Sequence, residues 1–185
     1  MSIERVFQAL QQALDSTGVP YMVTGSFASS TFGEPRASKD IDIVIAPTRE
    51  QLVELVRHFP DDQYYALEED ALEAFAHKSM FNIIDFASGW KIDLIVKKAR
   101  PFSDEEFNRR KEVEVAGLRL SVATAEDVLI SKLEWAKLGE SQRQLEDAAG
   151  IIRVQAASLD TAYIERWVRE LELSEQWAAA RSRAG

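Results

Sequence analysis

The sequence predicts an α/β (α+β) protein, with a mixed core up to about residue 122 and an α-helical part over residues 123–185. Two observations carry this prediction. Short β-rich segments alternate with helical patterns in the first part of the chain, and beyond Thr124 the composition turns helical to the end. At 185 residues, the chain is long enough for one sizeable core, or for one domain with a helical appendage.

The first expected elements follow from periodicity and turn residues. Apolar residues recur at helical spacing over residues 2–16, so we expect an amphipathic helix that stops at Gly18-Val19-Pro20. A short buried strand over residues 21–23 then leads into Gly25-Ser26. The small residues that follow can start a helix, which gives the order strand, glycine turn and helix.

The next expected strand covers residues 40–46, where acidic and apolar side chains alternate. Thr48 and Gln51 have the spacing of a capping box at the start of a helix. Residues 81–96 read as a hairpin with a glycine-containing turn, and a second hairpin is expected around Ala116-Gly117. Four helices are expected in the C-terminal part, at about residues 125–138, 141–154, 161–171 and 174–183.

Composition excludes several classes of function. A chain without cysteine has no disulfide, zinc-thiolate site, iron-sulfur cluster or thiol nucleophile, so a metal must be held by oxygen or by His58 and His77. A formal charge of -9 argues against nonspecific binding to duplex nucleic acid. No apolar run is long enough for a membrane span, and residues 1–12 lack a signal-peptide core, so we expect a soluble, cytoplasmic protein with no membrane partner.

Three acidic residues lie inside strand-like apolar segments. Asp40 and Asp42 alternate with isoleucines, so both side chains project from one face of an extended strand. Asp93 shares a face with Lys91 in a second apolar run, and it can join the other two acids if its strand is a neighbour. Carboxylates this close repel one another, and a proton or a divalent cation must relieve the repulsion. Mg²⁺ (or Mn²⁺) suits a site with only oxygen ligands.

This layout predicts the transfer of a nucleotidyl group. The reaction needs an acceptor hydroxyl in line with the α-phosphorus, and two metal ions can stabilise the attacking and leaving oxygens. Asp40 and Asp42 would bridge the metals, and Asp93 would help to deprotonate the acceptor hydroxyl. Gly25 lets the backbone approach a phosphate, while the Ser26 hydroxyl and the following helix N-terminus offer hydrogen-bond donors.

Each of these features also has a simpler interpretation. Gly25-Ser26 can be an ordinary turn, Asp40 and Asp42 can form a solvated face, and Asp93 can show the polar side of a hairpin to water. Their order along the chain and their apolar flanks favour a common site.

Residues 22–45 resemble the core motif of the DNA polymerase β-like nucleotidyltransferase superfamily: an apolar strand, Gly-Ser, a spacer, then Asp-apolar-Asp-apolar. Over about residues 19–100 the chain is most similar to small bacterial AbiEii-like and minimal nucleotidyltransferase proteins. The resemblance implies a mixed β-sheet flanked by helices. It also implies that Gly25 and Ser26 contact phosphate, and that the metal ligands are Asp40, Asp42 and Asp93.

A weaker resemblance extends into the helical part. It implies that Lys132 and Arg143 bind nucleotide and that Asp147 matches the acid of a Lys-Asp pair, whose lysine is replaced here by Glu146. Lys132 can instead be a surface lysine that snorkels from an apolar stripe. Arg143 and Asp147 are four residues apart and can form an ion pair along one helix.

The leading hypothesis is a metal-dependent enzyme that moves a nucleoside monophosphate from a nucleoside triphosphate, such as ATP, to an unidentified hydroxyl acceptor. By resemblance the acceptor is a protein side chain, a transfer RNA end or a small molecule such as an aminoglycoside, and the acidic chain favours a cationic small molecule or a protein. A toxin-like transferase would have a cognate antitoxin as its partner. Arg36 and Lys39, just before Asp40, can steer the substrates or lie in a solvated loop.

Two other classes of function stay open. One is a catalytically inactive nucleotide-binding or protein-interaction module of the same fold. The other is a metal-dependent phosphohydrolase, which would more usually bring histidines into the acidic cluster.

Overall fold

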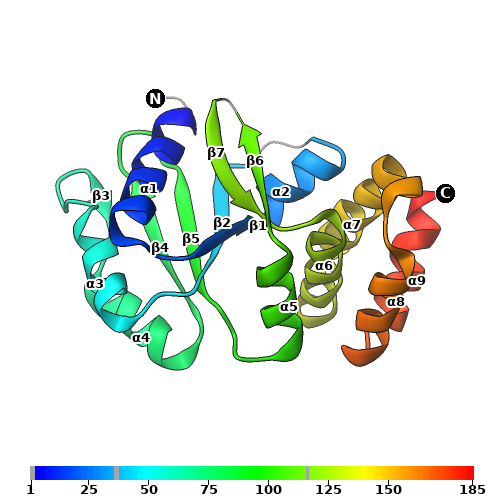
Figure 1. Cartoon of the computed structure of the whole chain (residues 1–185). Helices are drawn as coiled ribbons and strands as arrows, with labels where there is room; N and C mark the ends of the chain where they lie inside the picture. Colours follow the sequence, from blue (N-terminus) through cyan, green and yellow to red (C-terminus); the bar gives the residue numbers. More distant parts are fainter. Residues whose placement is uncertain (1–2, 36–37, 116) are drawn as a thin grey trace. The chain divides into compact units, whose positions relative to one another are not determined.

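The computed structural model describes residues 3–35, 38–115 and 117–185 (Figure 1). In these residues, one mixed sheet has the strand order β3-β4-β5-β2-β1-β7-β6. Its strands are β1 Tyr21–Thr24, β2 Asp40–Ile45, β3 Tyr64–Tyr65, β4 Met80–Asp85, β5 Lys91–Val96, β6 Lys111–Val115 and β7 Leu118–Val122. A mixed sheet with flanking helices is the fold class that the sequence predicts.

The strand pairs explain why the sheet is mixed. β2 pairs with β5 and β1 pairs with β7 in parallel, whereas β3-β4, β4-β5 and β6-β7 are antiparallel pairs. Both expected hairpins are therefore confirmed, β4 with β5 and β6 with β7. Of the second turn, Ala116 lies outside the described residues, and Gly117 has a positive φ of 78°.

Contacts within the chain define two compact units, which we call the sheet unit and the helical unit. The sheet unit consists of Met1–Val23 and Ser38–Val122, and the helical unit consists of Thr24–Ala37 and Ala123–Gly185. The segment Thr24–Ala37 thus belongs with the C-terminal helices. Because compact units describe contacts and not independent folding, the proposed domain boundary after residue 122 stays a prediction.

The helices divide between the two units. Those of the sheet unit are α1 Ile3–Thr17, α3 Arg49–Arg57, α4 Glu68–His77 and α5 Pro101–Arg109. Those of the helical unit are α2 Gly25–Phe32, α6 Ala125–Gly139, α7 Gln142–Gln155, the 3₁₀ turn Ala156–Ser158, α8 Thr161–Glu170 and α9 Ser174–Ala184. No helix in the described part of the chain is long and apolar enough to cross a membrane.

The capping box is confirmed at the start of α3. The Thr48 side chain accepts a hydrogen bond from the Gln51 backbone N–H, and the Gln51 side chain accepts one from the Thr48 backbone N–H. Two backbone donors at the helix N-terminus are satisfied in this way.

Two helices of the sheet unit have weak sequence patterns and are not expected from periodicity. The buried residues of α4 are Ala71 and Ala74, so this helix has no stripe of large apolar side chains. In α5, Pro101 stands in the first turn and polar residues separate the buried Phe102 and Phe107.

Alternation along β2 and β5 sends one set of side chains into the core of the sheet unit. The buried apolar residues of this set are Ile41, Ile43, Ile45, Ile92, Leu94 and Val96. The side chains of the opposite set therefore share the other face of both strands. This face carries the three acids.

Candidate active site

The register of β2 and β5 brings the three acids together. In this parallel pair Asp42 lies opposite Asp93, and Asp40 lies opposite Lys91. The expected neighbour relation between the two strands is therefore present. Asp40 is exposed, Asp42 is half-buried and Asp93 is only 4% exposed, so burial increases from Asp40 to Asp93.

Lys91 places its ammonium group among these carboxylates. Its Nζ lies 2.7 Å from Asp93 Oδ2 and 3.7 Å from Asp40 Oδ1. Burial lowers the pKa of Lys91, but the hydrogen bond to Asp93 and the negative charges of the three acids outweigh burial and raise it above its usual value. Lys91 therefore stays charged at neutral pH and offsets part of the repulsion among the acids.

Asp93 has a second hydrogen-bond donor in β4. The Asn82 side-chain amide donates to Asp93 Oδ1, while the Lys91 ammonium donates to Oδ2. Asn82 stands opposite Asp93 in the antiparallel pair of β4 and β5. Both oxygens of this buried carboxylate are thus satisfied, as a buried charge requires.

Sequence reasoning did not select Asn82, and it treated Lys91 only as a residue on the face of Asp93. Hairpin pairing is the signal that could have found Asn82. Counting back from the turn between β4 and β5 places this residue across from Asp93, where directly opposite side chains contact one another.

The donor set suits a divalent cation, although it is not arranged around one. Among the described residues, no group of three or more His, Cys, Asp or Glu side chains is placed to hold a metal ion. Two of the three carboxylates, those of Asp40 and Asp93, form ion pairs with the Lys91 ammonium. Carboxylate oxygens are the ligands that Mg²⁺ and Mn²⁺ favour, so the residue types suit such an ion, although their placement in this structure does not form a metal site.

Gly25 and Ser26 belong to the helical unit. Gly25 is the first residue of α2 and has a φ of 61°, a left-handed conformation that glycine adopts without strain. Thr24, at the N-cap, makes no side-chain capping hydrogen bond, and Ser26 is buried at 5% exposure. The expected order of strand, glycine turn and helix is present.

Lys132 and Asp147 form a buried ion pair within the helical unit. Lys132 Nζ lies 2.8 Å from Asp147 Oδ2, and the two side chains are 5% and 10% exposed. Lys132 is therefore not a surface lysine. Arg143 is exposed, and Glu146 accepts a hydrogen bond of 2.9 Å from Arg153.

The remaining candidates give little to the site. Arg36 lies outside the described residues, and Lys39 is exposed next to Asp40. His58 is on the surface, with its ring nitrogens 2.9 Å from Ser16 Oγ and 2.8 Å from the Glu54 carbonyl.

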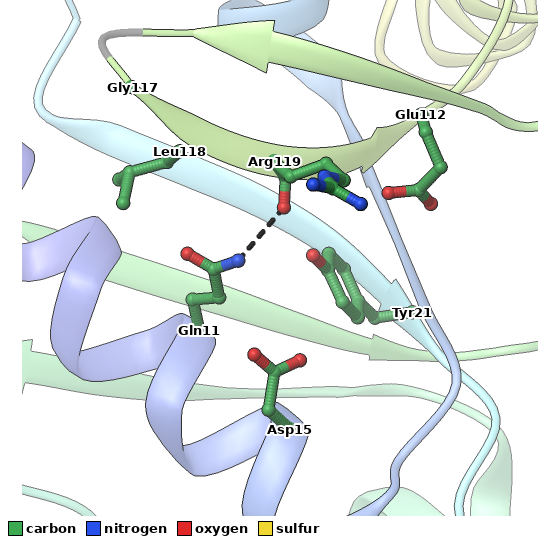
Figure 2. A pocket seen from close by; sticks show the side chains of 7 residues that line it. All are labelled: Gln11, Asp15, Tyr21, Glu112, Gly117, Leu118 and Arg119. Carbon is green, nitrogen blue, oxygen red and sulfur yellow. Dashed lines mark hydrogen bonds between the residues drawn. The ribbon is translucent and has the colours of Figure 1, made fainter.

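A separate hollow of about 520 Å³ lies in the sheet unit between α1 and the β6-β7 hairpin (Figure 2). It is lined by Gln11, Asp15, Tyr21, Glu112, Gly117, Leu118 and Arg119. Gln11 Nε2 donates to the Arg119 carbonyl at 2.9 Å across this hollow. Burial raises the pKa of the Tyr21 phenol, aided by the charges of Glu112 and Asp15. None of the lining residues is a predicted site residue.

Comparison with known proteins identifies the fold. The sequence matches no protein-family model. It also matches no curated protein. Among the solved structures that resemble the chain, the following three cover nearly its whole length.

The solution structure of the antibiotic-resistance factor ANT(2'')-Ia is 14% identical, with a TM-score of 0.56 over 96% of this chain and 94% of its own. The crystal structure of ANT(2'')-Ia in complex with adenylyl-2''-tobramycin is 15% identical, with a TM-score of 0.50 over 98% of each chain. An antigenic nucleotidyltransferase-like protein from Paracoccidioides brasiliensis is 17% identical, with a TM-score of 0.54 over 96% of this chain and 91% of its own. The chain therefore has the fold of nucleotidyltransferases.

Proposed function

We propose that this protein is a metal-dependent nucleotidyltransferase, which moves a nucleoside monophosphate from a nucleoside triphosphate to a hydroxyl acceptor. One observation carries the proposal. The parallel register of β2 and β5 puts Asp42 beside Asp93 and Asp40 next to them, on a face that already attracts a cation. The chain also has the fold of nucleotidyltransferases, which supports this choice of reaction.

Asp40, Asp42 and Asp93 would hold the divalent metal. When bound, Mg²⁺ or Mn²⁺ supplies positive charge to the triphosphate and to the attacking and leaving oxygens. The acceptor oxygen forms a bond to the α-phosphorus, the bond to the bridging oxygen of the β-phosphate breaks, and pyrophosphate leaves. Asp93 would take the proton of the acceptor hydroxyl on Oδ2 after the Lys91 ammonium has left this oxygen, while Asn82 holds Oδ1.

The remaining roles rest on the resemblance and on local geometry. Gly25 and Ser26 would contact the triphosphate, and the positive φ of Gly25 supports the close backbone approach that this role needs. Arg143 is exposed, so its guanidinium is accessible to a phosphate from solution. Its role as a nucleotide contact can be tested by mutation. Lys132 would have to leave Asp147 first, which makes it the weakest member of the proposed set.

For the acceptor, we propose a cationic small molecule with hydroxyl groups. A net charge of -9 favours a cation over an RNA acceptor. The complex of ANT(2'')-Ia with adenylyl-2''-tobramycin supports this choice, since the fold is shared. A protein side chain and a transfer RNA end remain the other acceptor classes to test, and a toxin-like role would add a cognate antitoxin as partner.

A catalytically inactive module is the second candidate function. The observation that favours it is the position of the Lys91 ammonium, which pairs with Asp40 and Asp93 and offsets part of the negative charge of the acids. Such a module would bind nucleotide or a partner through the same fold and transfer nothing.

A transfer assay separates these functions. The protein is incubated with Mg²⁺, each α-³²P-labelled ribonucleoside triphosphate and one acceptor class at a time: an aminoglycoside, bulk transfer RNA or a protein mixture. We expect labelled acceptor and released pyrophosphate with wild type and neither with Asp42→Asn. Label that persists in Asp42→Asn would contradict the proposed site. Magnesium-dependent nucleotide binding without transfer to any acceptor would favour the inactive module.

A further inference from the structure

The Lys91 ammonium forms ion pairs with two of the carboxylates that would hold a divalent cation under the proposed function. Its contacts to Asp93 Oδ2 at 2.7 Å and to Asp40 Oδ1 at 3.7 Å span the two strands that carry the acids. An ammonium ion and a divalent cation repel each other, so they compete for the same carboxylates.

We propose that Lys91 is an internal counter-ion, which the divalent cation must displace in order to bind. This inference rests on the proposed function, because it takes the acids of β2 and β5 as the metal ligands. It adds a property to that site. In the absence of substrate, the Lys91 ammonium lowers the affinity of the acids for the metal ion.

The geometry lets Lys91 leave without disturbing the acids. Its side chain is 37% exposed and carries the charge on a flexible stem, so the ammonium can turn into solvent. Asn82 holds the other oxygen of Asp93, and backbone pairing in β5 keeps the carboxylate in register with Asp42. Displacement therefore frees Asp93 Oδ2 while the orientation of the carboxylate is kept.

The ion pairs of Lys91 also affect the stability of the sheet unit. Three carboxylates on one face would otherwise destabilise the sheet unit by their mutual repulsion. Lys91 offsets this repulsion in the metal-free protein. The same compensation makes metal binding weaker than three carboxylates alone would allow.

The test is direct titration with Mn²⁺, without nucleotide, followed by the electron paramagnetic resonance signal of the free ion. The variants are Lys91→Met, Lys91→Arg, Lys97→Met and Asp42→Asn. Lys97→Met is the matched control, because Lys97 follows the last residue of β5, at the other end of the strand, and is paired with Asp104. It removes the same charge and the same side chain from the same unit.

We expect Lys91→Met to bind Mn²⁺ about tenfold more tightly than wild type, since one positive charge has left the acids. Lys91→Arg and Lys97→Met should stay within about twofold of wild type, and Asp42→Asn should lose the binding. Equal affinities of wild type and Lys91→Met, with binding still dependent on Asp42, would overturn the inference and leave the proposed function standing. Absence of any Asp42-dependent binding would instead overturn the proposed function.

A second measurement works on the wild-type chain and does not depend on the folding of Lys91→Met. Lysine ammonium groups held by carboxylates give resolved ¹⁵N NMR signals, and the signal absent from Lys91→Arg belongs to Lys91. Adding Mg²⁺ should move or broaden this signal and leave that of Lys97 unchanged. A Lys91 signal that Mg²⁺ does not affect, in protein shown to bind the ion, would overturn the inference.

Discussion

At the scale of single residues, the buried carboxylate of Asp93 affects the stability of the fold. A carboxylate that is 4% exposed costs folding free energy unless both its oxygens are satisfied, and Lys91 and Asn82 satisfy them. The same two donors fix the direction in which Asp93 points. Because both oxygens already accept hydrogen bonds, the proposed proton transfer to Asp93 requires the Lys91 ammonium to leave Oδ2.

Asp42→Asn should abolish transfer and leave the metal-free protein at least as stable as wild type. The substitution keeps the size of the side chain and removes one of three repelling charges, so the free energy of unfolding should rise or stay within about 1 kcal/mol. Urea unfolding in the presence of a chelator measures it. Loss of the fold in this variant would contradict the site.

Asp85→Asn is a matched control for Asp42→Asn, because it tests whether urea unfolding detects the loss of an aspartate that stabilises the fold. Asp85, at the end of β4, is buried and accepts hydrogen bonds from the backbone N–H and the hydroxyl of Ser88. Asp85→Asn weakens these charge-assisted bonds and should lower the free energy of unfolding by about 1 kcal/mol or more.

The residues of the site were predictable to different degrees. Alternation alone places Asp40 with Asp42, and Lys91 with Asp93, on common faces. The contact of Lys91 with Asp40 depends on the register of two parallel strands, which the sequence of either strand does not specify. Pairing across β4 and β5 likewise decides the partner of Asp93.

At the scale of elements, α2 ends where its backbone comes very close to α7. A Cβ atom on Gly33 would lie 2.9 Å from the Ser29 carbonyl oxygen and 3.0 Å from the Ile151 backbone nitrogen. The first distance, within α2, is shorter than real Cβ atoms show, and the second, to α7, is unusually tight, so glycine is the residue that fits here without a shift of the backbone. The ion pair between Glu34 and Arg153 lies beside this contact in the sequence and ties the same two segments together.

Gly33→Ala should lower the free energy of unfolding by about 1 to 3 kcal/mol, because backbone atoms of α2 and α7 must move apart. Gly139→Ala is the control, since a Cβ there meets nothing within 4 Å and the residue ends helix α6. It should be neutral or stabilising by up to about 1 kcal/mol. Urea unfolding of both variants gives the comparison, and equal effects would refute the close approach.

The ion pair between α6 and α7 gives a second test at this scale. Lys132→Met removes the ammonium that pairs with the largely buried Asp147 carboxylate, so the free energy of unfolding should fall by about 3 kcal/mol. Lys137→Met, on the same helix, removes a lysine that is 41% exposed and should cost less than about 1 kcal/mol.

The same pair of variants decides the role of Lys132. A structural lysine changes stability, and its loss leaves the dissociation constant of a nucleoside triphosphate unchanged in the folded protein. A nucleotide-binding lysine would show the reverse, with weakened binding and little change in unfolding.

Elements with strong local patterns were predictable, and those without were not. The helices α6 to α9 and both hairpins follow from periodicity and turn residues. In α4 the buried residues are small, so the pattern is weak. The packing of α2 with α6 and α7 joins segments far apart in the chain, and one sequence shows no sign of it.

At the scale of the whole molecule, the net charge limits the kinds of ligand that the chain can bind. The chain has the fold of nucleotidyltransferases, and its net charge of -9 attracts cations and repels nucleic acid. An acidic protein can bind an anionic triphosphate only if local positive charge or a metal ion compensates. Under the proposed function the metal would bind to the acids of β2 and β5 and supply this positive charge. Nucleotide binding should therefore depend on the metal.

Thermal unfolding with each of the four ribonucleoside triphosphates, with and without Mg²⁺, tests this central claim most directly. A ligand that binds only the folded state raises the midpoint according to its affinity. Wild type should show a rise that needs both Mg²⁺ and at least one triphosphate, and Asp42→Asn should show none. No rise with any triphosphate, or a rise that Asp42→Asn retains, would contradict a metal-nucleotide site at the acids of β2 and β5.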